Sequence, residues 1–222
     1  MATKDPYTFA YMKKNHLQLA HETHAAENKR ISKREKFRFI DLFCGIGGIR
    51  KSFESVGGKC VFSSDIDVFA QYTYYRNFGV VPYGDIVDIN DNGMEIPEHD
   101  LLCAGFPCQP FSHIGQRQGF EHPTQGTMFF EILRILDKCD PRLVFLENVP
   151  GMINHDNGRT LAIIMEELQK RGYTCSSDTL DSYDFGVPQR RKRFYLVGSK
   201  TGKRFEFPNP RKNHVDIGQF LE

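Results

Sequence analysis

The sequence predicts an α/β fold, a doubly wound, mostly parallel sheet with helices on both faces. Short apolar runs at residues 38–43, 100–104 and 142–146 have the length of buried strands. The last run is apolar throughout, as expected of a central parallel strand buried on both faces. Helical spacing of apolar residues follows at 127–139. A glycine loop, acids and a cysteine turn come directly after strands, where α/β sheets bind their ligands.

Composition narrows the class of protein. The chain has 222 residues, enough for one sizeable domain, with 40% hydrophobic and 26% charged residues. Its net charge of +1 means that any nucleic-acid binding must rest on local clusters. The six cysteines contain no C-x-x-C pair, so we expect no metal site. No apolar run approaches the ~20 residues that span a membrane, and we expect a cytoplasmic protein with reduced thiols.

Three regions differ in character. Residues 1–36 are polar and rich in His and Lys, and we interpret them as an N-terminal arm, either mobile or a solvated helix. Residues 37–200 carry the strands, the helices and every motif below, so they form the predicted catalytic domain. Residues 201–222 are polar and contain prolines, and we interpret them as the start of a C-terminal region.

The first strand runs into a glycine loop with Gly45, Gly47 and Gly48, followed by a helix at 49–56. Glycines let the backbone approach a ligand, and a helix amino terminus offers unpaired N–H groups. Arg50 stands where the dinucleotide pattern requires its third glycine, which argues against a nicotinamide dehydrogenase.

Acids end the next two segments. Asp65 follows the predicted strand 59–64, where a carboxylate can accept hydrogen bonds from both ribose hydroxyls. Asp67 is expected to cap the helix 68–78. Asp85, at a third ligand-facing end, is a candidate to hold an adenine amino group. Capping for Asp65 and a solvated turn for Asp85 remain open as alternatives.

The strand 100–104 leads to a turn that carries Cys108 between Pro107 and Pro110. A lone free cysteine is usually buried and inert, but a thiol on a proline-bracketed turn at a strand end is a candidate nucleophile. The polar segment 112–125 that follows is interpreted as a lid over it.

The apolar run 142–146 ends at Glu147, and a carboxylate in such a place is costly unless it has partners. That setting suits hydrogen bonding or proton transfer. Two further strands are predicted at 173–180 and 194–198. Between them lies a run of four cations, 190–193, which predicts binding of an anion such as phosphate, with a solvated face as the alternative.

In this order, the motifs resemble those of the cytosine-C5 DNA methyltransferases, an S-adenosylmethionine-dependent family with a Rossmann-like fold. The resemblance covers residues 37–200 and is greatest to bacterial modification methylases of the HhaI and MspI type. It rests on five segments of the chain: Asp-Leu-Phe-Cys-Gly-Ile-Gly-Gly (41–48), Gly-Asp-Ile (84–86), Gly-Phe-Pro-Cys-Gln-Pro-Phe-Ser (105–112), Glu-Asn-Val (147–149) and Gln-Arg-Arg-Lys-Arg (189–193).

The resemblance implies an activity and a set of site residues. The methyl donor would be S-adenosylmethionine, in a pocket lined by Phe43, Gly45, Gly47, Gly48, Asp65, Ile66, Asp85, Ile86 and Pro107. Cys108 would attack C6 of a cytosine flipped out of duplex DNA, and Glu147 would hold N3 and the exocyclic amine. Arg191 and Arg193 would grip the base oxygen, a flanking phosphate or Glu147. Ser112 and Gln189 would contact the DNA.

The sequence also departs from the family. Members continue with a target-recognition region and two further motifs, and none is recognisable here. We therefore expect the catalytic part of a restriction-modification methylase from a bacterium, acting on double-stranded DNA with a separate C-terminal chain or segment. A tRNA cytosine-5 methyltransferase and an inactive catalytic fragment or subunit of a split enzyme remain as alternatives. An adenine amino-methyltransferase is disfavoured, because its Asp/Asn-Pro-Pro-aromatic motif is absent.

Overall fold

The computed structural model describes residues 8–30, 35–107, 128–210 and 218. The chain divides into two compact units. The first contains residues 1–105 and 134–141, and the second contains residues 106–133 and 142–222. Each unit is described by itself. Within the described ranges, no helix is both long and apolar enough to cross a membrane.

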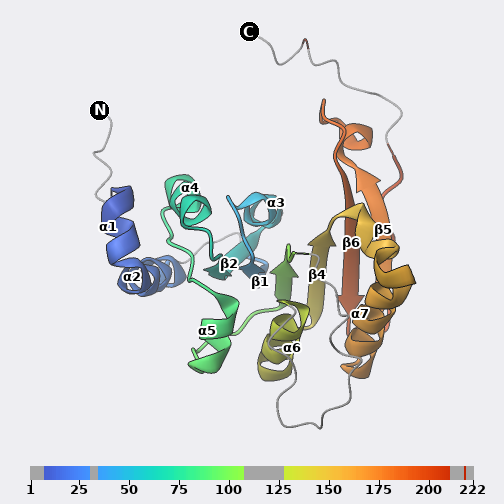
Figure 1. The fold of residues 1–222 in the computed structure, drawn as a ribbon, viewed down its shortest axis with the longest axis horizontal. Helices are drawn as coiled ribbons and strands as arrows, with labels where there is room; N and C mark the ends of the chain where they lie inside the picture. The colour runs from blue at the N-terminus through green and yellow to red at the C-terminus, as the bar shows by residue number, and fades with distance from the viewer. Residues whose placement is uncertain (1–7, 31–34, 108–127, 211–217, 219–222) are drawn as a thin grey trace. The chain divides into compact units, whose positions relative to one another are not determined.

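The first unit is built on parallel strands in the order β2-β1-β3 (Figure 1). They span Phe37–Leu42 (β1), Gly58–Ser64 (β2) and Leu101–Ala104 (β3). Leu42 pairs with Ser64 on one side and with Ala104 on the other. The residues that follow each strand therefore emerge at one edge of the sheet, which is where the predicted ligand-binding residues 43 and 65 lie.

Helices follow these strands, with ends that the sequence explains. They are α3 (Gly48–Ser55), α4 (Val68–Phe78) and α5 (Ile86–Asp91). The Asp67 carboxylate accepts hydrogen bonds from the N–H groups of Phe69 and Ala70, so the predicted cap of α4 is confirmed. Gly79 ends α4 in the left-handed conformation, with φ of 71°.

The N-terminal segment is a packed part of the first unit. It forms α1 (Phe9–Lys14) and α2 (His16–Lys29), with Leu19, Ala20 and His24 of α2 buried. The Phe9 ring stacks on that of Phe69 at 5.0 Å between centroids. The segment is therefore helical, as one of the two alternatives predicted, but it is neither a mobile arm nor solvated on all sides over residues 8–30. The packing of α2 was not predicted because its apolar pattern is sparse and part of its contact with β2 consists of hydrogen bonds.

The second unit holds antiparallel strands in the order β4-β6-β5, spanning Leu143–Asn148 (β4), Thr174–Asp181 (β5) and Lys192–Ser199 (β6). The helix α7 (Arg159–Lys170) precedes β5, and short 3₁₀ helices lie at Pro150–Ile153 (η1), His155–Gly158 (η2) and Ser182–Phe185 (η3). The helix α6 (Met128–Cys139), of which residues 128–133 belong to this unit and 134–139 to the first, precedes β4 and buries the apolar face predicted for it, including Phe129 and Ile132. Sheet strands alternating with helices confirm the α/β class, while β6 and β5 add antiparallel pairing.

Candidate functional site

The glycine loop leaves β1 in a conformation that few residues adopt. Phe43 has φ of 55°, and Gly45 and Gly47 have φ of 52° and 92°. Such values are uncommon for a bulky residue like Phe, and backbone strain of this kind clusters at functional sites. The loop is anchored at its start, because the Cys44 N–H donates to the Ser64 carbonyl at 3.0 Å.

The three glycines of the loop differ in what surrounds them. A Cβ on Gly47 would overlap the ring of Phe78, so this glycine is required by packing as well as by its φ. At Gly45 and Gly48, a Cβ would meet no atom of the described residues within 4 Å. The open space beside these two glycines is where a ligand can approach the backbone.

Asp65 ties this loop to the end of β2. One carboxylate oxygen accepts from the Gly45 N–H at 2.7 Å, and the other accepts from the Asp67 N–H at 2.8 Å. Each carboxylate oxygen can accept more than one hydrogen bond, so ribose hydroxyls remain possible partners. Ile46, next to Gly45 in the chain, and Ile66, next to Asp65, are 59% and 69% exposed, which suits contact with an apolar ligand face.

Asp85 caps α5, because its side chain accepts from the Val87 N–H at 2.9 Å. The neighbouring Ile86 is buried, with 3% of its surface exposed. The proposed contact of Asp85 with adenine stays a prediction, and Ile86 contributes to the core of the unit in this structure.

The amino terminus of α3 suits an anion. Its N-cap, Gly47, makes no side-chain cap hydrogen bond, so the first N–H groups of the helix lack that partner. Arg50, the third residue of α3, is buried, and its Nε donates to Glu54 at 2.7 Å rather than towards the helix end. Burial acts to lower the pKa of Arg50, but Tyr74, Cys60 and Glu54 outweigh it and raise that pKa. The arginine that breaks the dinucleotide pattern is thus a structural cation.

The cysteines of the described ranges are poorly suited to nucleophilic attack. The thiolate is the reactive form of cysteine. Burial raises the pKa of the Cys60 thiol to about 12 and that of the Cys175 thiol to about 11. Burial also raises the pKa of the other three described thiols, Cys44, Cys103 and Cys139. The sixth cysteine of the sequence, Cys108, lies outside the described residues, as do Ser112 and the predicted lid at 112–125. Pro107, the last residue before it, is exposed.

In the second unit, Arg193 of β6 donates from Nε to Oε1 of Glu147 in β4 at 2.8 Å. The two side chains are 21% and 25% exposed. A hydrogen bond between ionised groups is stronger than a neutral one, so the pair fixes the Glu147 carboxylate at the end of its strand. A contact with Glu147 was one of three alternatives predicted for this arginine.

Asn148 was quoted in the sequence motif without a role, and the structure supplies one. Its Nδ2 donates to the Phe106 carbonyl at 2.9 Å, and its Oδ1 accepts from the Val149 N–H at 2.8 Å. The side chain is 3% exposed. This amide therefore anchors the segment that leads into Pro107 and Cys108. A buried amide needs partners for both of its ends, but nothing in the sequence pattern identifies those partners.

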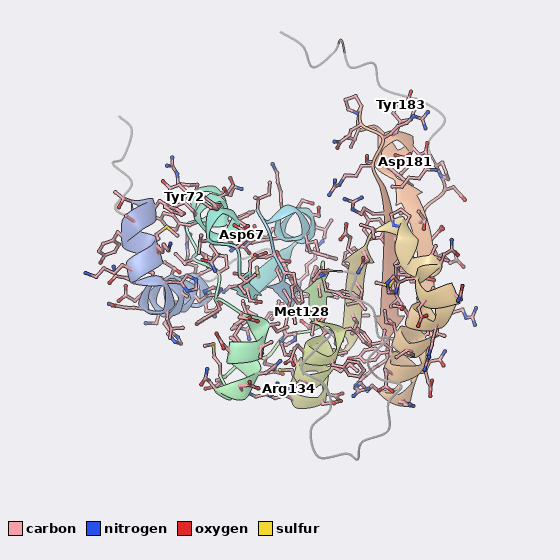
Figure 2. The ribbon with its side chains drawn as sticks, viewed as in Figure 1. Asp67, Tyr72, Met128, Arg134, Asp181 and Tyr183 are labelled. Atoms are coloured by element: carbon pink, nitrogen blue, oxygen red, sulfur yellow. The ribbon has the colours of Figure 1, made fainter. Side chains whose placement is uncertain are left out.

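The basic run lies on the β5–β6 hairpin, where Figure 2 labels Asp181 and Tyr183. Asp181 Oδ1 accepts from the N–H groups of Tyr183 at 3.2 Å and Arg191 at 2.9 Å. The Arg190 guanidinium lies over the Tyr183 ring, 4.6 Å from its centroid. Gln189, Arg190 and Arg191 are exposed, so the hairpin presents cations to solvent on a backbone that a buried acid holds.

Comparison with known proteins agrees with these motifs. Residues 37–220 match the family described as C-5 cytosine-specific DNA methylase. Curated relatives include "Type II methyltransferase M.MspI" of Moraxella sp, 57% identical over 98% of this chain and 52% of the relative, and "Type II methyltransferase M.HpaII" of Haemophilus parainfluenzae, 50% identical over 85% and 54%. The chain thus spans about half the length of the curated relatives it matches.

Among solved structures, the S. pombe Dnmt2 methyltransferase superposes with a TM-score of 0.65 at 23% identity, over 84% of this chain and 61% of that one. This likeness supports the fold. The resemblance inferred from the motifs is confirmed by the family match over residues 37–220: the chain belongs to the C-5 cytosine-specific DNA methylase family.

Proposed function

We propose that this chain is the catalytic part of a type II DNA (cytosine-5)-methyltransferase, which moves a methyl group from S-adenosylmethionine to C5 of a flipped-out cytosine. The observation that carries the proposal is the end of β4. There Glu147 is held by Arg193, and the adjacent Asn148 anchors the segment that leads to Cys108. One strand end thus positions the carboxylate and the approach to the thiol.

The edge of the first unit fits the cofactor. The uncapped amino terminus of α3 suits the carboxylate of a methionine moiety, and open space at Gly45 and Gly48 admits a ligand to the backbone. Asp65 would accept ribose hydroxyls. The other predicted lining residues of this unit are Phe43, Ile66, Asp85 and Ile86. When bound, S-adenosylmethionine supplies an electrophilic methyl group.

The chain's own residues would prepare the cytosine. The Cys108 thiolate forms a bond to C6, which makes C5 nucleophilic, and Glu147 hydrogen-bonds N3 and the exocyclic amine as charge builds there. After methyl transfer, a base removes the C5 proton and the bond to Cys108 breaks. Arg193 keeps Glu147 in place. Arg191 would bind the base oxygen or a flanking phosphate, with Gln189 and Ser112 also contacting DNA.

The choice of DNA over tRNA rests on the curated relatives, whose names describe type II methyltransferases. Because the chain spans about half of their length, we propose that target recognition comes from a separate C-terminal chain or segment. An inactive fragment is the competing reading for the isolated chain. A cytoplasmic location follows from the proposed substrate.

The test is transfer of labelled methyl from S-adenosylmethionine to mixed-sequence duplex DNA and to tRNA, with Cys108→Ser as the control. Each assay is run with the chain alone and with the C-terminal half of the Moraxella relative added in trans. Transfer to DNA that Cys108→Ser abolishes supports the proposal. Transfer to tRNA alone overturns the substrate. No transfer under either condition favours the inactive fragment.

A further inference from the structure

The carboxyl end of α4 binds the glycine loop through a residue, Asn77, that belongs to none of the sequence motifs. The side-chain Nδ2 of Asn77 donates to the Ile46 carbonyl at 2.9 Å, across 31 residues of chain. Asn77 is exposed, so the core does not require its amide. The bond fixes the peptide plane between Ile46 and Gly47, and the N–H of that same plane donates to the Cys44 carbonyl at 2.9 Å.

The next residue of α4 supports the same plane. The Phe78 ring occupies the space where a Gly47 side chain would stand. This ring is itself held, because the Arg50 guanidinium lies 4.6 Å from its centroid and the Tyr74 ring packs at 4.7 Å. Gly79 then ends the helix, which fixes where α4 stops relative to the loop.

Three consecutive loop residues are therefore each restrained by a different group. The Gly45 N–H is bound by Asp65, the Ile46 carbonyl by Asn77, and the Phe78 ring fills the space beside Gly47 where a Cβ would stand. Restraint before a ligand arrives lowers the ordering cost of binding. Only the Asp65 contact belongs to a residue that the proposed function already uses.

We propose that Asn77 is a positioning residue for the cofactor loop, acting with Phe78 and without touching the cofactor. Its amide sets the loop conformation that leaves the α3 amino terminus and the backbone at Gly45 and Gly48 open to S-adenosylmethionine. This inference rests on the proposed cofactor site and names a residue outside it that sets its affinity.

The test compares Asn77→Asp with Asn92→Asp in the full 222-residue chain. Both side chains are exposed, lie at or near the carboxyl end of a helix and donate to a backbone carbonyl, but Asn92 binds Asp88 of α5. Both variants keep the size of the side chain, remove the donor and add the same charge. Any difference between them therefore reports on the loop.

Two readouts are taken. The first is hydrogen exchange of the Gly45 and Gly47 amides by NMR in the ligand-free chain. We expect faster exchange in Asn77→Asp and no change in Asn92→Asp. The second is S-adenosylmethionine affinity by titration, where the loss of one hydrogen bond predicts a Kd raised about five- to tenfold in Asn77→Asp alone. Thermal unfolding should shift equally in the two variants.

The outcomes separate the two proposals. Equal loop exchange in the two variants overturns the positioning role, whatever the affinity. Faster loop exchange with an unchanged Kd overturns it as well, since the loop would then not set cofactor affinity. If the unmodified chain binds no S-adenosylmethionine even at high cofactor concentration, the proposed cofactor site is wrong, and so is a role of Asn77 in cofactor affinity. The exchange measurement in the ligand-free chain is independent of that result and shows whether Asn77 holds the loop.

Discussion

Arg193 donates to the Glu147 carboxylate across the β4–β6 pair at 2.8 Å. The acid at the end of β4 is therefore oriented before any nucleobase binds. Lysine presents its charge as a point and lacks the planar donor geometry of arginine. We therefore expect Arg193→Lys, which keeps the charge, to lower the methyl-transfer rate by roughly ten- to a hundredfold, less than the roughly hundred- to thousandfold cost of removing a preorganised donor altogether. Single-turnover transfer to DNA at saturating cofactor measures this rate.

Arg190 offers the matched control for that experiment. It lies on the same hairpin, but its guanidinium covers the Tyr183 ring. Arg190→Lys should leave the single-turnover rate unchanged and weaken DNA binding at most modestly. If both variants lose rate equally, the orienting role of Arg193 is wrong and the cations act as one phosphate-binding surface.

The glycines give a second prediction. Gly48 has ordinary helical backbone and open space around its missing Cβ, whereas Gly47 combines φ of 92° with the Phe78 ring against it. Gly48→Ala should therefore keep or slightly raise stability, by up to about 1 kcal/mol, while it weakens cofactor binding. Gly47→Ala should destabilise the fold itself. Chemical unfolding and cofactor titration of both variants separate these effects. Unimpaired affinity in Gly48→Ala would remove this glycine from the cofactor site.

Much of the fold could be predicted from the sequence because β1, β3 and β4 are short and mostly apolar. The runs at 38–43 and 142–146 correspond to β1 and β4 within two residues at each end. Motif residues at strand ends were predictable for the same reason, since the parallel register of β1 with β2 and β3 brings those ends to one edge.

The residues that hold the site in place could not be predicted in this way. Asn77, Asn148 and Asp181 bind backbone groups through one or two polar contacts each, and the contacts of Asn77 with Ile46 and of Asn148 with Phe106 cross more than 30 residues. Such contacts leave no periodic pattern in the sequence. The same reason explains why α2 looked solvated: His24 binds Ser63, and Asn28 binds the Val61 carbonyl at 3.1 Å.

Asp65 and Asp67, the two acids after β2, should differ in whether they affect cofactor affinity or stability. Asp67 caps α4, so Asp67→Ala should cost about 1 kcal/mol of stability and leave cofactor affinity unchanged. Asp65 binds the loop through one carboxylate oxygen, which accepts from the Gly45 N–H, while the other accepts from the Asp67 N–H. Asp65→Asn replaces one acceptor with a donor, so it should weaken cofactor binding more than it lowers stability. Thermal unfolding and cofactor titration of the two variants test this division, and a weaker cofactor affinity in Asp67→Ala would contradict it.

The buried His24 makes the docking of α2 dependent on pH. Its Nδ1 lies 2.9 Å from the Ala20 carbonyl, to which it donates, so its Nε2 accepts from the Ser63 N–H at 3.1 Å and cannot carry a proton without losing that bond. Burial lowers the pKa of His24 to about 4, opposed by the Ala20 carbonyl and assisted by the charges of Arg50 and His21.

Because the folded pKa of His24 lies below the ordinary histidine value of 6.5, the unfolded chain binds the proton more readily. The stability that His24 contributes is fully present above about pH 6.5 and is lost as the pH falls towards about 4. That loss is on the order of 3 kcal/mol. His24→Gln cannot titrate, so its stability deficit relative to the unmodified chain should be largest at neutral pH and shrink on acidification.

Urea unfolding of both proteins between pH 7 and pH 4 measures this difference directly. Burial also lowers the pKa of His16 and His99, but these residues are present in both proteins and their effects cancel. A deficit that stays constant with pH would show that the folded protein accommodates a charged His24. It would also mean that α2 remains docked when its hydrogen bond to Ser63 is lost.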